Sequence, residues 1–187
     1  MLEKSNYKHN KTVGEPYAIV NGHRRNKIAA MKFGIKNFDA VGSGIIAVYN
    51  LMILLNRPAP LAETARELYI KAATPLGFFG VHPLTVFRYF SSHYLPVNLD
   101  RDYDSFCDKF GSGFCGIIFK WTGRKFFSPI HAFAIESYKG KIYVYNRTPD
   151  SARRYEYQRI SSVTDSKSFI VGYYINRDEF DKFKYLR

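Results

Sequence analysis

Cysteine is scarce in this chain of 187 residues, which carries two thiols, Cys107 and Cys115. Two thiols do not form the disulfide framework of a small secreted domain, and no Cys-x-x-Cys pair or Cys/His metal spacing occurs. Cys115 falls within a strand pattern and is expected to be a buried thiol, and Cys107 is expected on the face of a short helix. The sequence therefore points away from disulfide-rich and metal-binding classes.

Long apolar runs are also missing. The most apolar stretch, GIIAVYNLMILL, has about 12 residues, which is too short to span a membrane. The first residues, MLEKSNYKHNKTVGE, have no apolar core and so do not resemble a secretory signal. We therefore expect a cytoplasmic protein with no transmembrane segment.

Acidic residues are few relative to basic ones. The chain has 16 Asp and Glu against 28 Lys and Arg, which gives a net charge of +12. Such an excess favours an acidic partner, whether nucleic acid, anionic lipid or an acidic peptide. The basic residues are scattered, however, and no basic helix or nucleic-acid motif organises them. A solvated basic surface is the expected interpretation, with nucleic-acid binding as the less favoured alternative.

What the chain does contain is the composition of a globular protein. Hydrophobic residues make up 46% of the chain and aromatic residues 17%, which is sufficient for an ordinary core. We interpret residues 1–187 as a single domain, because the length is typical of one. Within it, residues 1–30 are polar and basic, and we interpret them as an N-terminal arm or a pro-segment.

Helix patterns dominate the first half and strand patterns the second. The spacing predicts helices over residues 43–55, 61–73 and 83–94, and a short helix at DYDSFCDKF. β-branched and aromatic runs predict strands over residues 114–121, 130–137, 141–147 and 169–176. Residues 43–55 are apolar nearly all round, so this helix is expected to be central and buried. The order predicts an α+β fold, with an N-terminal helical lobe packed on an antiparallel sheet.

The first candidate site is Gly42-Ser43-Gly44, which begins the central helix. The two glycines permit close approach of the backbone and unusual dihedral angles. Ser43 stands at a helix N-terminus, where the dipole and the free N–H groups activate a thiol far more than a hydroxyl. Asn37, six residues upstream, offers an amide N–H to an oxyanion, with the backbone N–H of Ser43 as the second donor.

The second candidate site is formed by two neighbouring strands. In its simplest register, the YKGK turn places His131 opposite Asn146. The amide oxygen of Asn146 would then hold the imidazole in one orientation and tautomer. A bulge at Gly140 would place Arg147 opposite His131 instead.

Asn37, the GSG that opens an apolar helix, His131 in HAFAI and Asn146 together resemble the pattern of the papain-like cysteine peptidases. In that family an oxyanion Gln is followed by a Cys at a helix N-terminus, then a His, then an Asn or Asp. GSGIIAVYNLMILL is particularly similar to the CG-x-x-A-x-x-N helix of bacterial papain-like proteins near the double-glycine leader peptidases. The resemblance covers roughly residues 30–176.

The resemblance implies a papain-like fold and assigns a role to each residue. Ser43 takes the nucleophile position, His131 is the general base, Asn146 orients that His and Asn37 forms the oxyanion hole. Gly42 and Gly44 then lie beside the bound substrate and complete the expected site. The implied activity is that of a peptidase or acyl transferase working through an acyl-enzyme on a peptide or protein. A leader peptide is one candidate substrate, and no metal or organic cofactor is needed.

Two positions depart from the family pattern. Asn37 replaces Gln with a shorter side chain that has the same amide, and Ser43 stands where the family has Cys. A Ser in a site built for a thiolate–imidazolium pair retains binding but loses most turnover, because the His alone must deprotonate a poor acid. The chain is then a natural pseudoenzyme or a Cys-to-Ser form trapped in an inactive state, with a working serine peptidase as a third alternative.

Other interpretations stay open. A non-catalytic module could hold a peptide or a partner protein in the same cleft, and a basic domain could bind a polyanion. Each candidate residue also has an ordinary structural explanation. Ser43 could be a plain helix N-cap, His131 a core histidine, Asn146 a turn residue and Asn37 a loop amide.

Overall fold

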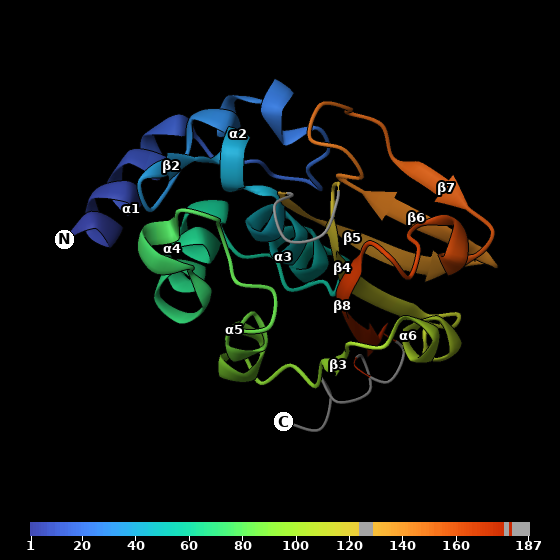
Figure 1. Cartoon of the computed structure of the whole chain (residues 1–187). Coiled ribbons are helices and arrows are strands. Elements are labelled where there is room, and N and C mark those ends of the chain that lie inside the picture. Colours follow the sequence, from blue (N-terminus) through green and yellow to red (C-terminus); the bar gives the residue numbers. More distant parts are fainter. Residues whose placement is uncertain (124–128, 178–179, 181–187) are drawn as a thin grey trace.

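The computed structural model describes residues 1–123, 129–177 and 180. Over these residues the protein is a mixed α+β fold, with helices in the first half and an antiparallel six-stranded sheet in the second (Figure 1). The strand order in this sheet is β3-β8-β4-β5-β6-β7. The predicted α+β class is therefore confirmed.

The helices are α1 (Leu2–Val13), α2 (Phe38–Val41), α3 (Ser43–Leu54), α4 (Leu61–Ala72), α5 (Phe87–Ser92) and α6 (Tyr103–Lys109). The strands of the large sheet are β3 (Asn98–Asp100), β4 (Phe114–Trp121), β5 (Ile130–Tyr138), β6 (Lys141–Tyr145), β7 (Tyr155–Tyr157) and β8 (Phe169–Asn176). A separate short hairpin is formed by β1 (Lys32–Phe33) and β2 (Lys36–Asn37). In the part of the chain that the structure describes, no helix combines the length and apolar character needed to cross a membrane.

Helix α3 lies at the centre of the fold, as its uniformly apolar sequence predicts. Nearly all of its side chains are buried, and the helix packs on β4 and β5 (Figure 1). Ala132 and Ala134 of β5 belong to the same core as the helix. Small side chains at a contact let two elements approach closely. This packing sets Ser43, at the start of α3, against the strand that carries His131.

The predicted elements agree with the structure to different extents. Strands β4 and β8 have the predicted bounds, and β5 and β6 differ from the prediction by one or two residues at one end. The third predicted helix is shorter, because residues 83–86 form turns before α5. There the Thr85 hydroxyl donates to the carbonyl groups of Ala72 and His82, which competes with helical hydrogen bonding. The short strands β1, β2, β3 and β7 were not predicted, because two or three residues carry no readable periodicity.

The β5–β6 hairpin has a different register from the predicted one. Lys139 and Gly140 form its two-residue turn, with φ angles of 50° and 73°. Positive φ at both central positions is what a type I′ turn requires. The turn lies one residue later than predicted, and the ladder between the strands ends at Tyr145. The expected direct pairing of His131 with Asn146 is therefore wrong by two residues.

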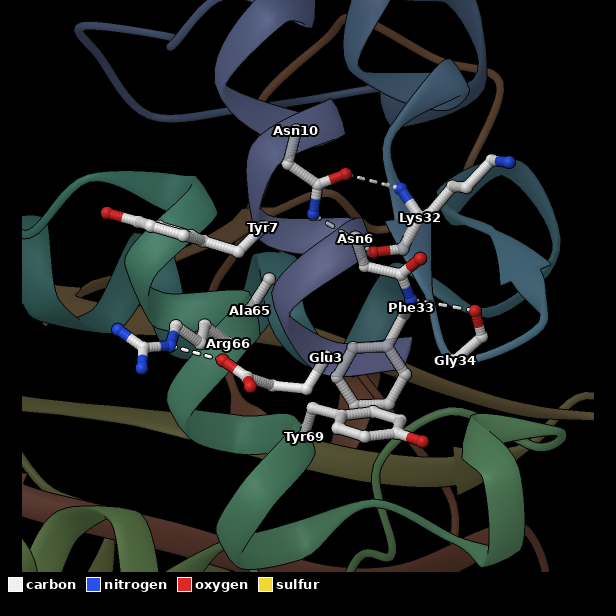
Figure 2. A pocket seen from close by; sticks show the side chains of 10 residues that line it. All are labelled: Glu3, Asn6, Tyr7, Asn10, Lys32, Phe33, Gly34, Ala65, Arg66 and Tyr69. Atoms are coloured by element: carbon white, nitrogen blue, oxygen red, sulfur yellow. Dashed lines mark hydrogen bonds and ion pairs between the residues drawn. The ribbon is translucent and has the colours of Figure 1, made fainter. Parts of the chain in front are cut away.

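Residues 2–13 of the N-terminal segment form the helix α1. Figure 2 shows how polar side chains attach this helix to the β1–β2 hairpin. Asn6 Nδ2 donates to the carbonyl oxygen of Gly34 at 2.7 Å, and Asn10 exchanges two hydrogen bonds with the backbone of Lys32. Both asparagines are buried, so these bonds satisfy amides that would otherwise be costly to remove from water.

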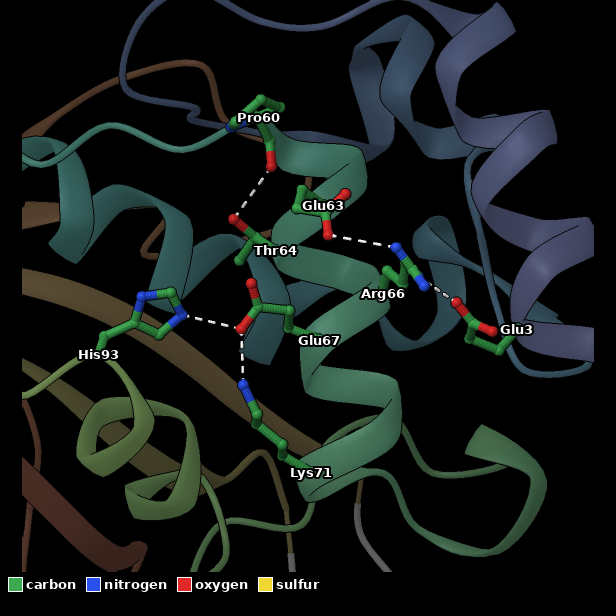
Figure 3. Close-up of polar contacts among 8 residues, drawn as sticks. All are labelled: Glu3, Pro60, Glu63, Thr64, Arg66, Glu67, Lys71 and His93. Atoms are coloured by element: carbon green, nitrogen blue, oxygen red, sulfur yellow. Dashed lines mark hydrogen bonds and ion pairs between the residues drawn. The ribbon is translucent and has the colours of Figure 1, made fainter.

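Helix α4 carries ion pairs that connect the helical lobe (Figure 3). Arg66 pairs with Glu3 of α1. Glu67 accepts from Lys71 at 2.7 Å and from His93 at 2.8 Å. These contacts join α4 to the N-terminal helix and to the segment after α5, and they support the lobe against which α3 packs.

Candidate active site

A cleft of about 410 Å³ opens at the start of α3, beside the ends of β4 and β5. Ser43 and His131, which the sequence pairs as nucleophile and base, both line it. No residue of α1 is among the lining residues, so this helix does not occupy the cleft in the described chain. The lining residues are His23, Arg24, Asp39, Ala40, Ser43, Lys120, Trp121, Thr122, Pro129, Ile130, His131, Arg147, Thr148 and Pro149.

Ser43 is the first residue of α3, as predicted, and it is partly buried. Its Oγ accepts a hydrogen bond from the backbone N–H of Ala132 at 3.3 Å. Ala132 directly follows His131 on β5, so this bond connects the nucleophile position to the strand of the candidate base. Within the described residues, no hydrogen bond joins the Ser43 hydroxyl to the His131 ring.

The two glycines beside Ser43 permit close packing. A Cβ added to Gly44 would lie 2.2 Å from Cγ2 of Val81, and one added to Gly42 would lie 2.6 Å from the carbonyl oxygen of Phe38. Neither distance is compatible with a side chain unless the neighbour moves. The expected close approach is therefore present, whereas the unusual dihedral angles are not found at Gly42, which has ordinary helical values of φ −74° and ψ −16°.

His131 is oriented by a main-chain group, not by the amide side chain that the sequence suggested. Its Nε2 lies 2.8 Å from the carbonyl oxygen of Asn146. A carbonyl oxygen only accepts, so Nε2 carries the hydrogen and Nδ1 is the unprotonated nitrogen of the neutral ring. Burial lowers the pKa of His131 to about 4, and the nearby His23 and Arg147 act in the same direction. The ring is therefore neutral at pH 7.

Asn146 is fully buried, and its side chain binds His23. Its Oδ1 lies 3.1 Å from His23 Nδ1 and 3.4 Å from the backbone nitrogen of His23. Its backbone N–H donates to Asn21 Oδ1 at 2.6 Å. With φ of 57°, Asn146 takes a left-handed conformation that Asn tolerates better than most residues, and the chain leaves β6 here. Asn146 thus contacts one histidine with its side chain and the other with its main chain.

His23 belongs to the site, although no sequence pattern indicated it. Its side chain is 2% exposed, and burial lowers its pKa. The partner residue, Asn146, is 123 positions away in the chain, so no local pattern could connect the two. In Figure 1 the N-terminal segment, in blue, passes beside the segment after β6, in orange. A backbone hydrogen bond from Arg24 to the carbonyl oxygen of Pro149, at 2.9 Å, joins these two segments.

Asn50 fixes the same N-terminal segment to the central helix. Its Oδ1 accepts from the backbone N–H of Val20 at 2.9 Å, and its Nδ2 donates to the carbonyl oxygen of Val20 at 2.8 Å. Asn50 is fully buried on α3. Asn50 is the Asn of the AVYN sequence. A lone amide in an apolar helix is a sequence signal that could have predicted a buried hydrogen-bonding role for this residue. Residues 20–24 therefore bridge α3 and the turn that orients His131.

Asn37 lies away from the other predicted site residues. It ends β2, where it pairs with Lys32, and its side chain is exposed. It does not line the cleft, whereas Asp39 and Ala40 of the following helix do. The short helix α2 separates Asn37 from Ser43, and this insertion was not predicted. The oxyanion role of Asn37 therefore has no support from its position.

No protein-family model matches the chain, and no curated protein is significantly similar to it. In the ranges that the structure describes, no group of three or more His, Cys, Asp and Glu side chains could hold a metal ion. Cys115 is buried in β4 and Cys107 is partly buried on α6, as expected, and no disulfide joins the two. The chemistry of the site is therefore interpreted from its own residues.

Proposed function

We propose that this chain has the scaffold of a papain-like cysteine peptidase or acyl transferase that acts on peptides, with Ser43 in the nucleophile position. The observation that carries the proposal is the shared cleft of Ser43, at the start of the buried helix α3, and His131, a neutral imidazole with a fixed tautomer. The order of these two residues along the chain agrees with the resemblance in the sequence. Asn146 follows as the residue that orients the His.

The site suits a thiol better than the hydroxyl it contains. A Cys at position 43 would lie at a helix N-terminus, in a cleft that is also lined by the cationic side chains of Arg24, Lys120 and Arg147. Such surroundings stabilise a thiolate. Proton transfer to His131 would give a thiolate–imidazolium pair, attack on an amide carbonyl would give an acyl-enzyme, and water or an amine would release the acyl group. A Ser hydroxyl gains little from the same surroundings, so we expect little or no turnover from the chain as it stands.

Alkylation of a Ser43→Cys variant tests this proposal. We expect iodoacetamide to modify the introduced thiol rapidly at pH 6, because a catalytic pair keeps the thiol ionised well below its ordinary pKa of about 8.5. Adding His131→Ala should slow the reaction at pH 6 and leave the rate at pH 9 nearly unchanged. Mass spectrometry of the digested protein separates this thiol from Cys107 and Cys115.

Ser91→Cys is the matched control, since Ser91 is an exposed residue of helix α5. Its alkylation should rise only near pH 8 to 9, as for an ordinary thiol. If the Ser43→Cys thiol followed the same pH profile as the control, with or without His131, the site would not be built for nucleophilic catalysis.

A non-catalytic module that binds a peptide in the cleft is the second candidate function. Two observations favour it. Ser43 Oγ accepts a hydrogen bond from the backbone of Ala132, and the low pKa of His131 keeps its ring neutral, so the site holds no imidazolium that could pair with an anionic nucleophile. An ordinary pH profile in the alkylation experiment would leave this candidate in first place.

A further inference from the structure

The walls of the cleft carry more positive than negative charge. Arg24, Lys120 and Arg147 line it, and Asp39 is the one acidic residue among the described lining residues. Arg24 is already engaged, because it donates to the carbonyl oxygen of Asp39 at 2.8 Å and lies 3.5 Å from the carboxylate of Asp150. Lys120 and Arg147 are different, since neither has an ion pair with any described carboxylate.

Lys120 is placed beside the candidate base by the register of the sheet. It is the cross-strand partner of His131 between β4 and β5, so the two side chains leave the sheet on the same face. Burial and the positive charge of Arg147 both lower the pKa of Lys120. Asp165 acts weakly in the opposite direction, and its carboxylate is already bound by Ser168. Two cations near each other with no bound anion are a source of unfavourable energy that an anionic ligand would relieve.

Arg147 is held in place by aromatic rings. Its guanidinium lies 5.4 Å from the centroid of Phe133 and 6.0 Å from that of Tyr157, and its Nε donates to the Tyr157 hydroxyl at 3.3 Å. Of the N–H groups of the guanidinium, these contacts use the Nε–H, and within the described residues its terminal NH₂ groups make no hydrogen bond. A guanidinium that is already oriented loses little conformational freedom when it binds a carboxylate in two-pronged fashion.

We propose that Lys120 and Arg147 form a carboxylate-binding subsite in the cleft, so that the peptide accepted beside Ser43 presents an acidic group next to the reacting bond. This inference rests on the proposed function, because it takes the cleft as a peptide site. The carboxylate belongs either to an Asp or Glu side chain or to the C-terminus of the peptide. Two cations in a small cleft suit one such group, whereas a nucleic-acid backbone needs a longer basic surface.

The first test compares an anionic with a neutral alkylating agent on the Ser43→Cys variant. We measure the rates of iodoacetate and iodoacetamide at pH 8, because a lowered pKa would cost Lys120 part of its charge at higher pH. The ratio of the two rates is divided by the ratio for the same thiol in urea, and the ionised fraction of the thiol cancels because both agents share it. We expect the folded protein to favour iodoacetate by about fivefold, the size of one screened charge interaction at close range. Lys120→Gln and Arg147→Gln should each lower this preference by about twofold or more.

Two controls separate this inference from the proposed function. Lys4→Gln removes an exposed charge on α1, outside the cleft, and should leave the preference unchanged. His131→Ala should also retain the preference, because the subsite does not depend on an imidazolium. Loss of the preference in His131→Ala, or a ratio equal to that in urea, would overturn the subsite. An ordinary pH profile with a persisting preference would instead count against the catalytic pair alone.

The second test identifies the source of the carboxylate. Three peptides compete with iodoacetamide for the Ser43→Cys thiol: acetyl-Gly-Glu-Gly-amide, acetyl-Gly-Gln-Gly-amide and acetyl-Gly-Gln-Gly with a free carboxyl end. Protection by the first alone assigns the subsite to an acidic side chain, and protection by the third alone assigns it to a C-terminus. Equal protection by all three, or protection by a single-stranded oligonucleotide and by none of the peptides, would refute a peptide carboxylate as the ligand.

Discussion

Replacing Asn50 with Ala should destabilise the protein strongly, because this amide satisfies two backbone groups of Val20 in the interior. Both residues are buried, and water cannot replace the lost hydrogen bonds without opening the core. A buried donor or acceptor without a partner costs about 1–3 kcal/mol, so two such groups should reduce the free energy of unfolding by about 3 kcal/mol. This is a large part of the roughly 5–15 kcal/mol that stabilises an ordinary domain.

Urea unfolding measures this effect. With a slope of about 2 kcal/mol per M, a loss of about 3 kcal/mol lowers the midpoint by about 1.5 M. The chain has one tryptophan, Trp121, which lines the cleft, so its fluorescence follows the same region that Asn50 supports. Circular dichroism of the helices gives an independent probe and tests whether the transition is two-state.

Asn98→Ala is the matched control, since Asn98 is an exposed residue of the edge strand β3. The free energy of unfolding of this control should change by less than about 0.5 kcal/mol. An Asn50→Ala variant as stable as this control would refute the reasoning, because it would mean that residues 20–24 are not held by the central helix.

Two further predictions concern the buried histidines. The pKa of His131 is lower in the folded chain, at about 4, than the ordinary value of 6.5, so the unfolded chain binds the extra proton first. Stability should therefore fall by about 3 kcal/mol as the pH drops from about 6.5 to 4. His131→Gln should reduce this loss of stability, whereas His82→Gln, at an exposed position, should leave it unchanged. Identical curves of stability against pH for the unchanged chain and both variants would contradict the assignment of the loss to His131. His23→Ala should remove the side-chain partner of Asn146 and destabilise the fold by about 2 kcal/mol in urea, whereas no measurable change would show that the backbone bond of residue 23 suffices.

The sequence was sufficient for most of the secondary structure and for the position of Ser43. Residues 43–54 are apolar nearly all round, which is typical of a central helix, and the four long strands have β-branched and aromatic runs. These signals are local, because a side-chain period or a glycine at a helix start is contained within a few residues. The α+β class follows from their order along the chain.

Tertiary structure decided how the site residues meet. The type I′ turn at Lys139 and Gly140 shifted the hairpin, so that His131 contacts the carbonyl oxygen of Asn146 and not its amide. The amide instead binds His23, from a segment that no pattern connects with this strand. The papain-like role of these residues stays a prediction, carried by the shared cleft.

Sequence by itself therefore determined which elements form and where the central helix begins, because these depend on neighbouring residues. Only the folded chain decided that Asn37 lies outside the cleft, that His23 lies beside Asn146, and that Lys120 stands across from His131. Each of these depends on the exact register of a strand or on the path of a segment without regular structure. A shift of one residue in either changes which side chains meet, while the hydrophobic pattern that the sequence displays stays the same.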